Sequence, residues 1–351
     1  MSAFQELNLA TEDMVNQNRL YQPSNFWNNA SKQITQELTI NGIEKFRSLE
    51  TTLGYFVPTY GVPGNCFTQE MTKILIEKLS HSFPLDIKPK LALEQFLSGY
   101  VSALADFRVF VAADKQKRLP FLHTFSESNF GEPVEQFELE GRMFSRSSLN
   151  YLLGLTLLKK HLKGFIPKTV MEIGGGFGTL GEILSFSGIK DCKYIDFDIP
   201  PTSFVAQKYL CSVFGEKNVT TYKQTRHKMR INITELKPAS VFCSWQIERL
   251  YGKIDLFVNF ISFQEMEPDI VKNYLNHVDR LSVKWILLRN IREGKNKIKK
   301  GCSEGVEIPI RSDDYLTMLP SYDLIERNVI PYGFKTVDNF HSELLLLKRK
   351  S

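Results

Sequence analysis

Residues Thr169-Val-Met-Glu-Ile-Gly-Gly-Gly-Phe-Gly-Thr-Leu-Gly181 are the most informative part of this 351-residue chain. A β-rich apolar run leads into Gly174, Gly176 and Gly178. Glycine suits such a position because the missing Cβ lets the backbone turn tightly and lie against a ligand. The pattern therefore predicts a strand, then a ligand-binding turn, then a helix.

Apolar runs alternate with helical patterns from Thr169 onward, which is typical of a parallel sheet covered by helices on both faces. The strands that we expect are Val170–Gly174, Lys193–Phe197, Ser240–Ser244, Asp255–Phe260, Lys284–Arg289, Asp323–Ile330 and Glu343–Lys348. Five strands with helical crossovers, closed by a C-terminal antiparallel pair, indicate an α/β fold with the Rossmann-like, mostly parallel sheet of class I methyltransferases.

The first part of the chain is expected to be mainly helical. Apolar residues recur at three- and four-residue spacing over Phe67–Leu79 and over Leu91–Leu104, and one more helix is expected over Ser145–Lys163. We therefore predict a helical N-terminal domain at residues 1–144, which serves as a lid, an acceptor site or a dimer surface. A methyltransferase domain would follow at residues 145–351.

A dinucleotide-binding loop is the rival interpretation of the glycines. Gly176-Phe-Gly178-Thr-Leu-Gly181 also fits GxGxxG, and Asp196 lies twenty residues beyond Gly176, as a ribose-binding acid would. That register would place Glu172 and two extra glycines before the turn, which is unusual for a core strand. The C-terminal strand pair also favours a methyltransferase. In that class a loop of this kind wraps the methionine part of S-adenosyl-L-methionine, and Glu172 would help to fix it.

An acid at the end of the second strand is the next signal. Such a carboxylate accepts both ribose hydroxyls of the cofactor in a charge-assisted contact. Asp198 lies where the strand should end, just before Pro200 and Pro201, so we prefer it. Asp196 stays open as the alternative, because residues two apart share one face of a strand.

Polar residues also follow the third and fourth strands. Ligands in open α/β sheets bind at the carboxyl ends of strands, so these residues are candidates for the cofactor pocket and for chemistry. Beside the adenine we expect Ser244, Trp245 and Gln246, although Trp245 would suit the core equally well. After the fourth strand come Asn259, Ser262, Gln264 and Glu265.

The chain resembles a sugar O-methyltransferase family of bacterial glycan and capsule gene clusters. The segments that carry the resemblance are MEIGGGFGTLGEIL (171–184), YIDFDIPPTSFVAQKYL (194–210), LFVNFISFQEMEPDIVKNYL (256–275), YQPSNFW (21–27) and FRSLETTLGYFVPTYG (46–61). The resemblance implies methylation of a hydroxyl on a sugar or glycan precursor, in the biosynthesis of bacterial surface polysaccharide. A phosphoramidate, a small metabolite or a peptide as acceptor, and a catalytically inactive binding protein, stay open as alternatives.

A sugar hydroxyl is a poor nucleophile, so a general base is expected near the methyl donor. Glu265 is the first candidate, because it follows the fourth strand, and a carboxylate at a helix N-terminus is the alternative role. His341, expected in the loop before the last strand, is the second. Arg146 and Tyr151, on the helix from Ser145, are further candidates for contact with the cofactor carboxylate.

Composition sets limits on the other classes of function. Lys and Arg number 44 against 39 Asp and Glu, and no nucleic-acid-binding motif accompanies this small excess. No signal peptide or transmembrane stretch is evident, and the five cysteines contain no CxxC pair. We therefore expect a cytoplasmic enzyme with reduced thiols and a small-molecule or glycan acceptor, without nucleic acid, stable membrane insertion or a bound metal. A homodimer, formed through the helical N-terminal part, stays open.

Overall fold

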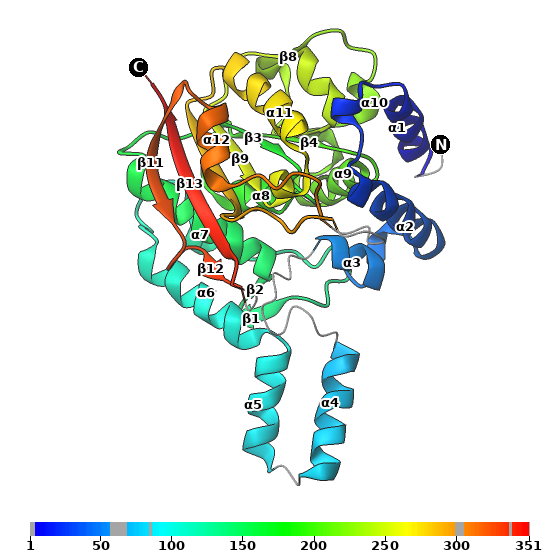
Figure 1. Cartoon of the computed structure of the whole chain (residues 1–351), viewed down its shortest axis with the longest axis vertical. Coiled ribbons are helices and arrows are strands. Elements are labelled where there is room, and N and C mark those ends of the chain that lie inside the picture. Colours follow the sequence, from blue (N-terminus) through cyan, green and yellow to red (C-terminus); the bar gives the residue numbers. More distant parts are fainter. Residues whose placement is uncertain (1–3, 57–68, 84–85, 299–304, 337–338, 351) are drawn as a thin grey trace.

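The computed structural model describes residues 4–56, 69–83, 86–298, 305–336 and 339–350. Within these ranges the centre of the molecule is a nine-stranded mixed sheet (Figure 1). Its order is β11-β13-β10-β9-β3-β4-β7-β5, and β12 pairs with β13 beside this path. The strands are β3 (Thr169–Ile173), β4 (Lys193–Asp198), β5 (Val219–Thr220), β7 (Ala239–Cys243), β9 (Leu256–Phe260), β10 (Trp285–Ile291), β11 (Tyr322–Asn328), β12 (Phe334–Lys335) and β13 (His341–Arg349).

The sheet confirms the predicted fold class. Strands β5, β7, β4, β3, β9 and β10 pair in parallel, whereas β13 is antiparallel to both β10 and β11. All seven expected strands are present, with ends that differ from the predicted ones by at most two residues. Strand β3 lies at the middle of the sheet, between β9 and β4, so the glycine loop that follows it lies where the strand order reverses.

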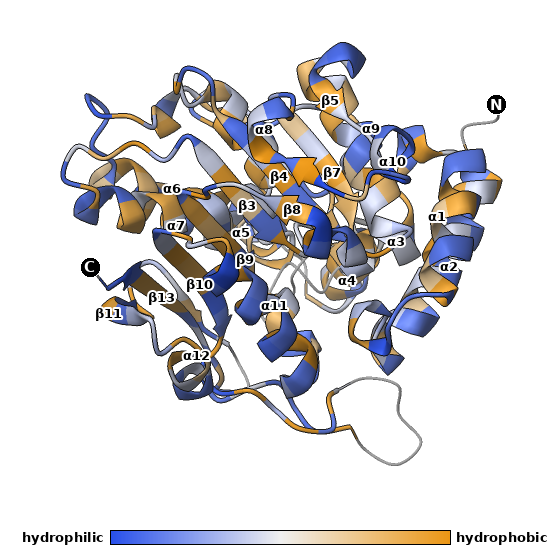
Figure 2. Ribbon diagram, turned by 90° about the horizontal axis from the view of Figure 1, so that it is seen from above, coloured by the Kyte–Doolittle hydropathy of each residue, from blue (hydrophilic) through white to orange (hydrophobic). Residues whose placement is uncertain are grey.

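Alternating residues of the strands divide the core into two layers. Val258 and Leu287 pack with residues of α7 (Arg146–His161), α8 (Thr179–Phe186) and α9 (Thr202–Phe214). Phe257 and Ile286, their neighbours along the chain, pack on the opposite face with α11 (Pro268–Arg280) and α12 (Ser312–Met318). The strands are correspondingly hydrophobic between these helices in Figure 2. Period-two alternation between two helical layers is what a sheet covered on both faces requires.

Helices make up most of the N-terminal part. They are α1 (Gln5–Val15), α2 (Asn25–Asn41), α3 (Glu50–Phe56), α4 (Gln69–Ser82), α5 (Ile87–Leu97) and α6 (Tyr100–Ala113), and a short hairpin of β1 (Phe137–Leu139) and β2 (Arg142–Phe144) leads into α7. Leu7 of α1, and Ile34 and Leu38 of α2, belong to the same hydrophobic cluster as the residues of α7 and α9. The domain boundary after residue 144 stays a prediction.

The predicted single helix over Leu91–Leu104 is wrong. The chain forms α5 and α6 there, with an angle of 69° between them. Helix α5 ends at Leu97, and two residues later Gly99 adopts the left-handed conformation, with φ of +84°, and separates the two helices. The apolar spacing continues across this break and therefore concealed it. The other expected helices, α4 and α7, are present, although the start of the first, Phe67 and Thr68, lies outside the described residues.

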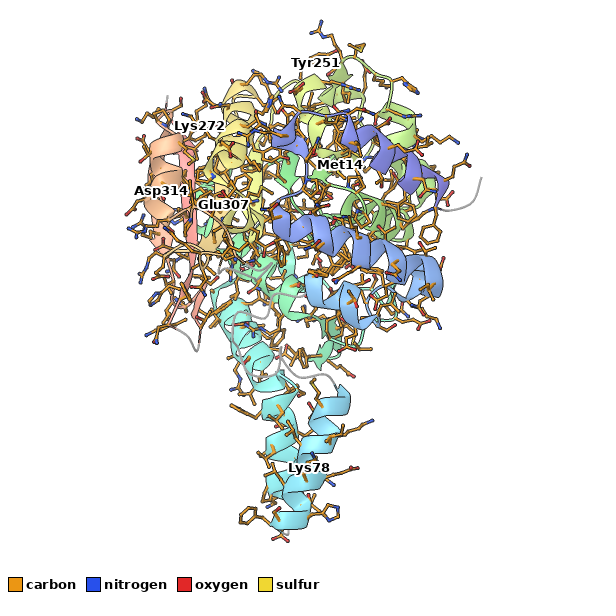
Figure 3. All side chains as sticks on the ribbon, turned by 45° about the vertical axis from the view of Figure 1, so that its right-hand side comes forward. Met14, Lys78, Tyr251, Lys272, Glu307 and Asp314 are labelled. Carbon is orange, nitrogen blue, oxygen red and sulfur yellow. The ribbon has the colours of Figure 1, made fainter. Side chains whose placement is uncertain are left out.

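Helices α4 and α5 form a hairpin that extends away from the body of the molecule (Figure 1), and Figure 3 labels Lys78 on it. No single helix in the described ranges is long and apolar enough to cross a membrane; α5 and α6 meet those criteria together, across their bend.

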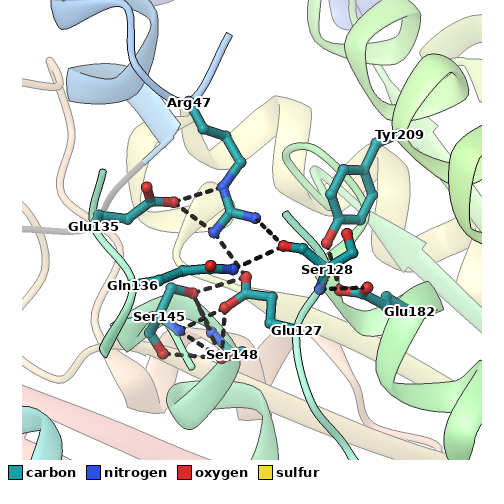
Figure 4. Close-up of polar contacts among 9 residues, drawn as sticks. All are labelled: Arg47, Glu127, Ser128, Glu135, Gln136, Ser145, Ser148, Glu182 and Tyr209. Atoms are coloured by element: carbon teal, nitrogen blue, oxygen red, sulfur yellow. Dashed lines mark hydrogen bonds and ion pairs between the residues drawn. The ribbon is translucent and has the colours of Figure 1, made fainter. Parts of the chain in front are cut away.

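A buried polar network joins the N-terminal part to the helices around the glycine loop (Figure 4). The guanidinium of Arg47 pairs with Glu127 at 3.0 Å and with Glu135 at 2.6 Å. Glu127 also accepts hydrogen bonds from the backbone N–H and the hydroxyl of Ser145, which caps α7. Beside it, Glu182 of α8 accepts a hydrogen bond from the hydroxyl of Tyr209 on α9. Because Arg47 pairs with two of the carboxylates and the backbone N–H of Ser128 donates to Glu182, the network fixes the N-terminus of α7 relative to α8.

Candidate functional site

A cavity of about 740 Å³ lies at the carboxyl ends of the central strands. Its floor includes the glycine loop after β3 and the ends of β4 and β9, and residues of α2 and α3 form the opposite wall. From the sequence-predicted set it is lined by Tyr151, Gly174, Gly176, Asp198, Ser244, Ser262, Gln264 and Glu265. The topology thus gathers residues that are more than a hundred positions apart in the chain.

Gly176 is where the glycine loop is open to the cavity. Gly174, Gly176 and Gly178 have φ values of +69°, +62° and +97°, a backbone region that residues other than glycine rarely adopt. A Cβ added at Gly176 would meet only the Phe56 ring, at 3.7 Å. A Cβ at Gly174 would instead clash with Ser262 Oγ at 2.2 Å, and one at Gly178 would press on Leu210. The backbone at Gly176 is therefore free to touch a ligand, and the other two glycines allow close packing.

Glu172 lies under the glycine loop and does not line the cavity. Its carboxylate accepts hydrogen bonds from the hydroxyls of Tyr151, at 2.7 Å, and Tyr194, at 2.6 Å. Burial raises the pKa of Glu172 to about 7, although both hydroxyls oppose this shift by stabilising the anion. Glu172 thus contacts two tyrosine side chains of the protein and does not reach the cavity.

The structure separates the two acids of β4. Asp198 lines the cavity, and the backbone N–H of Ile199 donates to it at 2.7 Å. Asp196 is fully buried beside Glu172 and accepts a hydrogen bond from the N–H of Gly175 at 3.3 Å. Burial is the main cause that raises the pKa of both aspartates, and their mutual repulsion adds to the shift at Asp196.

Of the residues expected beside the adenine, only Ser244 lines the cavity, and its hydroxyl donates to the carbonyl of Tyr21 at 2.9 Å. Gln246 is buried, and its side-chain oxygen accepts from the N–H of Cys243 at 2.9 Å. Trp245 is buried against the Tyr222 ring. These two residues therefore lie behind the wall of the cavity, in the packed core.

Asn259 holds the end of β9 to the glycine loop. Its side-chain amide donates to the carbonyl of Ile173 at 2.9 Å, and Ser262 Oγ donates to the same carbonyl at 3.0 Å. Between them Ile261 has a φ of +78°, which is unfavourable for a β-branched residue. This sharp bend turns the short 3₁₀ helix Ser262–Glu265 toward the cavity.

Glu265 lines the cavity with both carboxylate oxygens engaged. Trp27 Nε1 donates to Oε2 at 3.0 Å, and Lys295 Nζ donates to Oε1 at 2.9 Å. Trp27 is placed by the first turn of α2, where the Ser24 hydroxyl caps the helix. Glu265 therefore ties the N-terminal segment to the sheet.

His341 does not line the cavity. It is the first residue of β13, not part of the preceding loop as predicted, because it pairs with Lys335 of β12. Its Nδ1 lies 2.6 Å from Glu293 Oε1, and its neighbour Phe340 lines the cavity instead.

The two candidates on α7 diverge. Arg146 is buried away from the cavity, where it pairs with Asp106 at 3.0 Å and its guanidinium lies over the Phe334 ring. Tyr151 lines the cavity, and its ring stacks on Phe260 with 4.7 Å between centroids.

The sequence interpretation assigned no role to an aromatic cluster on the cavity wall. The rings of Phe26, Trp27 and Tyr55 contact one another, with centroid separations of 5.7 to 6.0 Å, and Lys295 lies beside them. The segments YQPSNFW and FRSLETTLGYFVPTYG contain these rings, so the resemblance over these two segments is the signal that could have drawn attention to them. Its role as a wall depends on contacts across more than 200 residues.

A metal site is not evident in the described ranges: no group of three or more His, Cys, Asp or Glu side chains there is arranged to hold an ion. Asp314, one of a pair of adjacent acids, accepts from the backbone N–H of Arg311 at 2.7 Å and caps α12.

No protein-family model matches this sequence, and a search of curated proteins finds no match either. Several solved structures that resemble the chain are methyltransferases. Magnesium protoporphyrin IX methyltransferase from Synechocystis PCC 6803, with bound S-adenosylmethionine, aligns over 58% of this chain and 81% of its own, at 14% identity and a TM-score of 0.38. A methyltransferase from Leishmania major aligns over 58% of this chain and 74% of its own, at 11% identity and a TM-score of 0.40. Mitomycin 7-O-methyltransferase aligns over 97% of this chain and 76% of its own, at 11% identity and a TM-score of 0.38.

Proposed function

We propose that this chain is an S-adenosyl-L-methionine-dependent O-methyltransferase that acts on a hydroxyl of a sugar or glycan precursor, in the biosynthesis of bacterial surface polysaccharide. The observation that carries the proposal is the juxtaposition of Gly176 and Asp198 in one cavity. A bare backbone turn and a carboxylate one strand away match the two ends of a sulfonium nucleoside.

The donor side of the cavity fits this cofactor. The space beside Gly176, which a Cβ would fill, leaves room for the methionine part. Asp198 would accept the ribose hydroxyls, because its carboxylate reaches the cavity while that of Asp196 does not. Ser244 and Ile199 line the neighbouring wall and would adjoin the adenine. Glu172 and Asn259 would support the loop from beneath, through Tyr151 and the Ile173 carbonyl.

The acceptor side suits a polyhydroxylated ring. Trp27 and Tyr55 offer aromatic faces, and the amides of Gln33 and Asn150 and the carboxylate of Glu265 line the same cavity. Small-molecule sites commonly combine apolar faces with a few placed polar groups in this way. The combination supports a sugar acceptor over a purely apolar one.

The chemistry follows from position. Bound S-adenosylmethionine supplies a methyl group activated by the sulfonium charge, so the protein must align the acceptor oxygen and remove its proton. Glu265 is placed to take that proton, held in its rotamer by Trp27 and Lys295. Tyr55 and Phe56 of α3 line the cavity opposite the glycine loop and help to exclude water.

Calorimetry with S-adenosylmethionine tests the cofactor site. We expect the native chain to bind it, and Asp198→Asn and Gly176→Val each to abolish measurable binding. Asp191→Asn is the matched control, because Asp191 is an exposed carboxylate just before β4 and should leave binding unchanged. Unchanged affinity in both site variants, or binding of a nicotinamide dinucleotide instead, would refute the site. An acceptor screen that detects the gain of one methyl by mass, with and without chelator, then tests the reaction.

A further inference from the structure

Lys295 is the one cation among the described residues that line the cavity, and three carboxylates line it too, those of Glu50, Asp198 and Glu265. Its ammonium nitrogen lies 2.9 Å from Glu265 Oε1 and 4.4 Å from the centre of the Phe26 ring. The side chain is largely buried, with 22% of its surface exposed. A charged ammonium group is thus held between a carboxylate and an aromatic ring.

Other residues build this ammonium position independently of Lys295. Trp27 Nε1 fixes the second oxygen of Glu265 at 3.0 Å. The rings of Phe26 and Trp27 meet edge to face at 5.7 Å, and Tyr55 packs against both. A carboxylate beside aromatic faces is the chemistry that recognises organic ammonium groups, through an ion pair and the negative ring faces.

The charge of the cavity favours the same class of ligand. Apart from Lys295, the charged side chains of the described part of the chain that line it are all carboxylates. An anionic acceptor would meet repulsion from them, whereas an ammonium-bearing acceptor would be attracted. The cavity should therefore bind an ammonium-bearing sugar more tightly than an anionic sugar with the same ring.

We propose that Phe26, Trp27 and Glu265 form a binding site for a primary ammonium group on the acceptor, and that the Lys295 side chain occupies this site as an internal competitor. The inference rests on the proposed function and narrows the acceptor to an amino sugar, whose ammonium anchors the ring while a neighbouring hydroxyl is methylated. A carboxylate has about four lone-pair sites, so Glu265 can hold the ammonium and accept from the hydroxyl together.

Saturation-transfer NMR titrations of three probes test the site: glucosamine at mildly acidic pH, where its amine is protonated, N-acetylglucosamine, which is neutral, and glucuronate, which is anionic. We expect glucosamine to bind the native chain more tightly than either other probe. In Lys295→Met the competitor is gone, so glucosamine affinity should rise about tenfold, while Lys295→Arg should keep the native affinity. Glu265→Gln should lose the preference for glucosamine.

Lys297→Met is the matched control. It removes the same charge two residues away, and Lys297 is exposed and does not line the cavity. Native affinity for glucosamine in this control, beside the rise in Lys295→Met, supports a local competitor. An equal rise in both variants, equal binding of glucosamine and N-acetylglucosamine, or no binding of glucosamine to any variant overturns the inference. A chain that prefers glucosamine yet fails to bind S-adenosylmethionine keeps the ammonium site and loses the proposed function.

Discussion

The hydroxyl of Tyr151 donates a hydrogen bond to the carboxylate of Glu172, with 2.7 Å between the oxygens, while the Tyr151 ring stacks on Phe260. One side chain therefore touches the strand that precedes the glycine loop and the strand that precedes Glu265. The glycine loop rests on this contact, because Glu172 lies directly beneath it.

Tyr151→Phe should destabilise the chain by about 1–2 kcal/mol, because a fully buried carboxylate loses one of its two hydroxyl donors while the ring stacking remains. Urea denaturation measures the change. Tyr251→Phe, at a less buried tyrosine (labelled in Figure 3), should have little effect. Equal stability of the two variants would contradict a supporting role for the Tyr151 hydroxyl.

Glu172→Gln should flatten the pH dependence of stability. The folded pKa of Glu172 is about 7, above its ordinary value of 4.5. The folded state therefore binds the proton more tightly than the unfolded state, so this stabilisation is complete below about pH 4.5 and is lost as the pH rises through about 7. Between these limits the free energy of unfolding should fall less steeply in Glu172→Gln than in the native chain. Parallel curves for the two proteins would rule out a raised pKa at this residue.

Glu265→Gln should lower kcat by roughly 10²–10⁴-fold with an acceptor found in the screen, because the amide cannot take the hydroxyl proton. Affinity for S-adenosylmethionine should stay within about twofold, since Glu265 lies on the acceptor side. Glu307→Gln, at an exposed glutamate that does not line the cavity, serves as the control for lost charge. A Glu265→Gln enzyme with native kcat would exclude this residue as the base.

Gly131→Ala should destabilise the chain more than Gly141→Ala. Both glycines have positive φ, +94° and +73°, so both variants incur backbone strain of about 1 kcal/mol. Only at Gly131 would the new Cβ clash, at 2.6 Å from the Phe46 ring, whereas nothing lies within 4 Å at Gly141. Thermal unfolding of both variants isolates the clash, and equal losses would mean that Phe46 moves aside without cost.

The sequence predicted the sheet well because each strand is a short apolar run followed by a polar or glycine-rich turn. The seven main strands were confirmed for that reason, and the helix from Ser145 was confirmed as well. Local patterns failed where a distant contact or a single residue decides the outcome. Gly99 divides an apolar helical pattern, and the pairing of His341 with Lys335 extends the last strand by two residues.

The candidate site was predictable only in part. Residues at strand ends, such as Asp198 and Gly176, could be placed from the order of the strands. The partners of Glu265 could not, because Trp27 lies 238 positions away and Lys295 follows the next strand. Long-range packing of this kind leaves no periodic signal in the sequence.

The glycine loop and the strand ends that would hold the nucleoside lie after residue 169, whereas the aromatic rings of the acceptor side lie on α2 and α3, before residue 57. Selection on acceptor preference can therefore act on the early stretch without disturbing the nucleoside-binding half. Homologues that diverge mainly before residue 57 would be expected to share one methyl donor and differ in what they methylate.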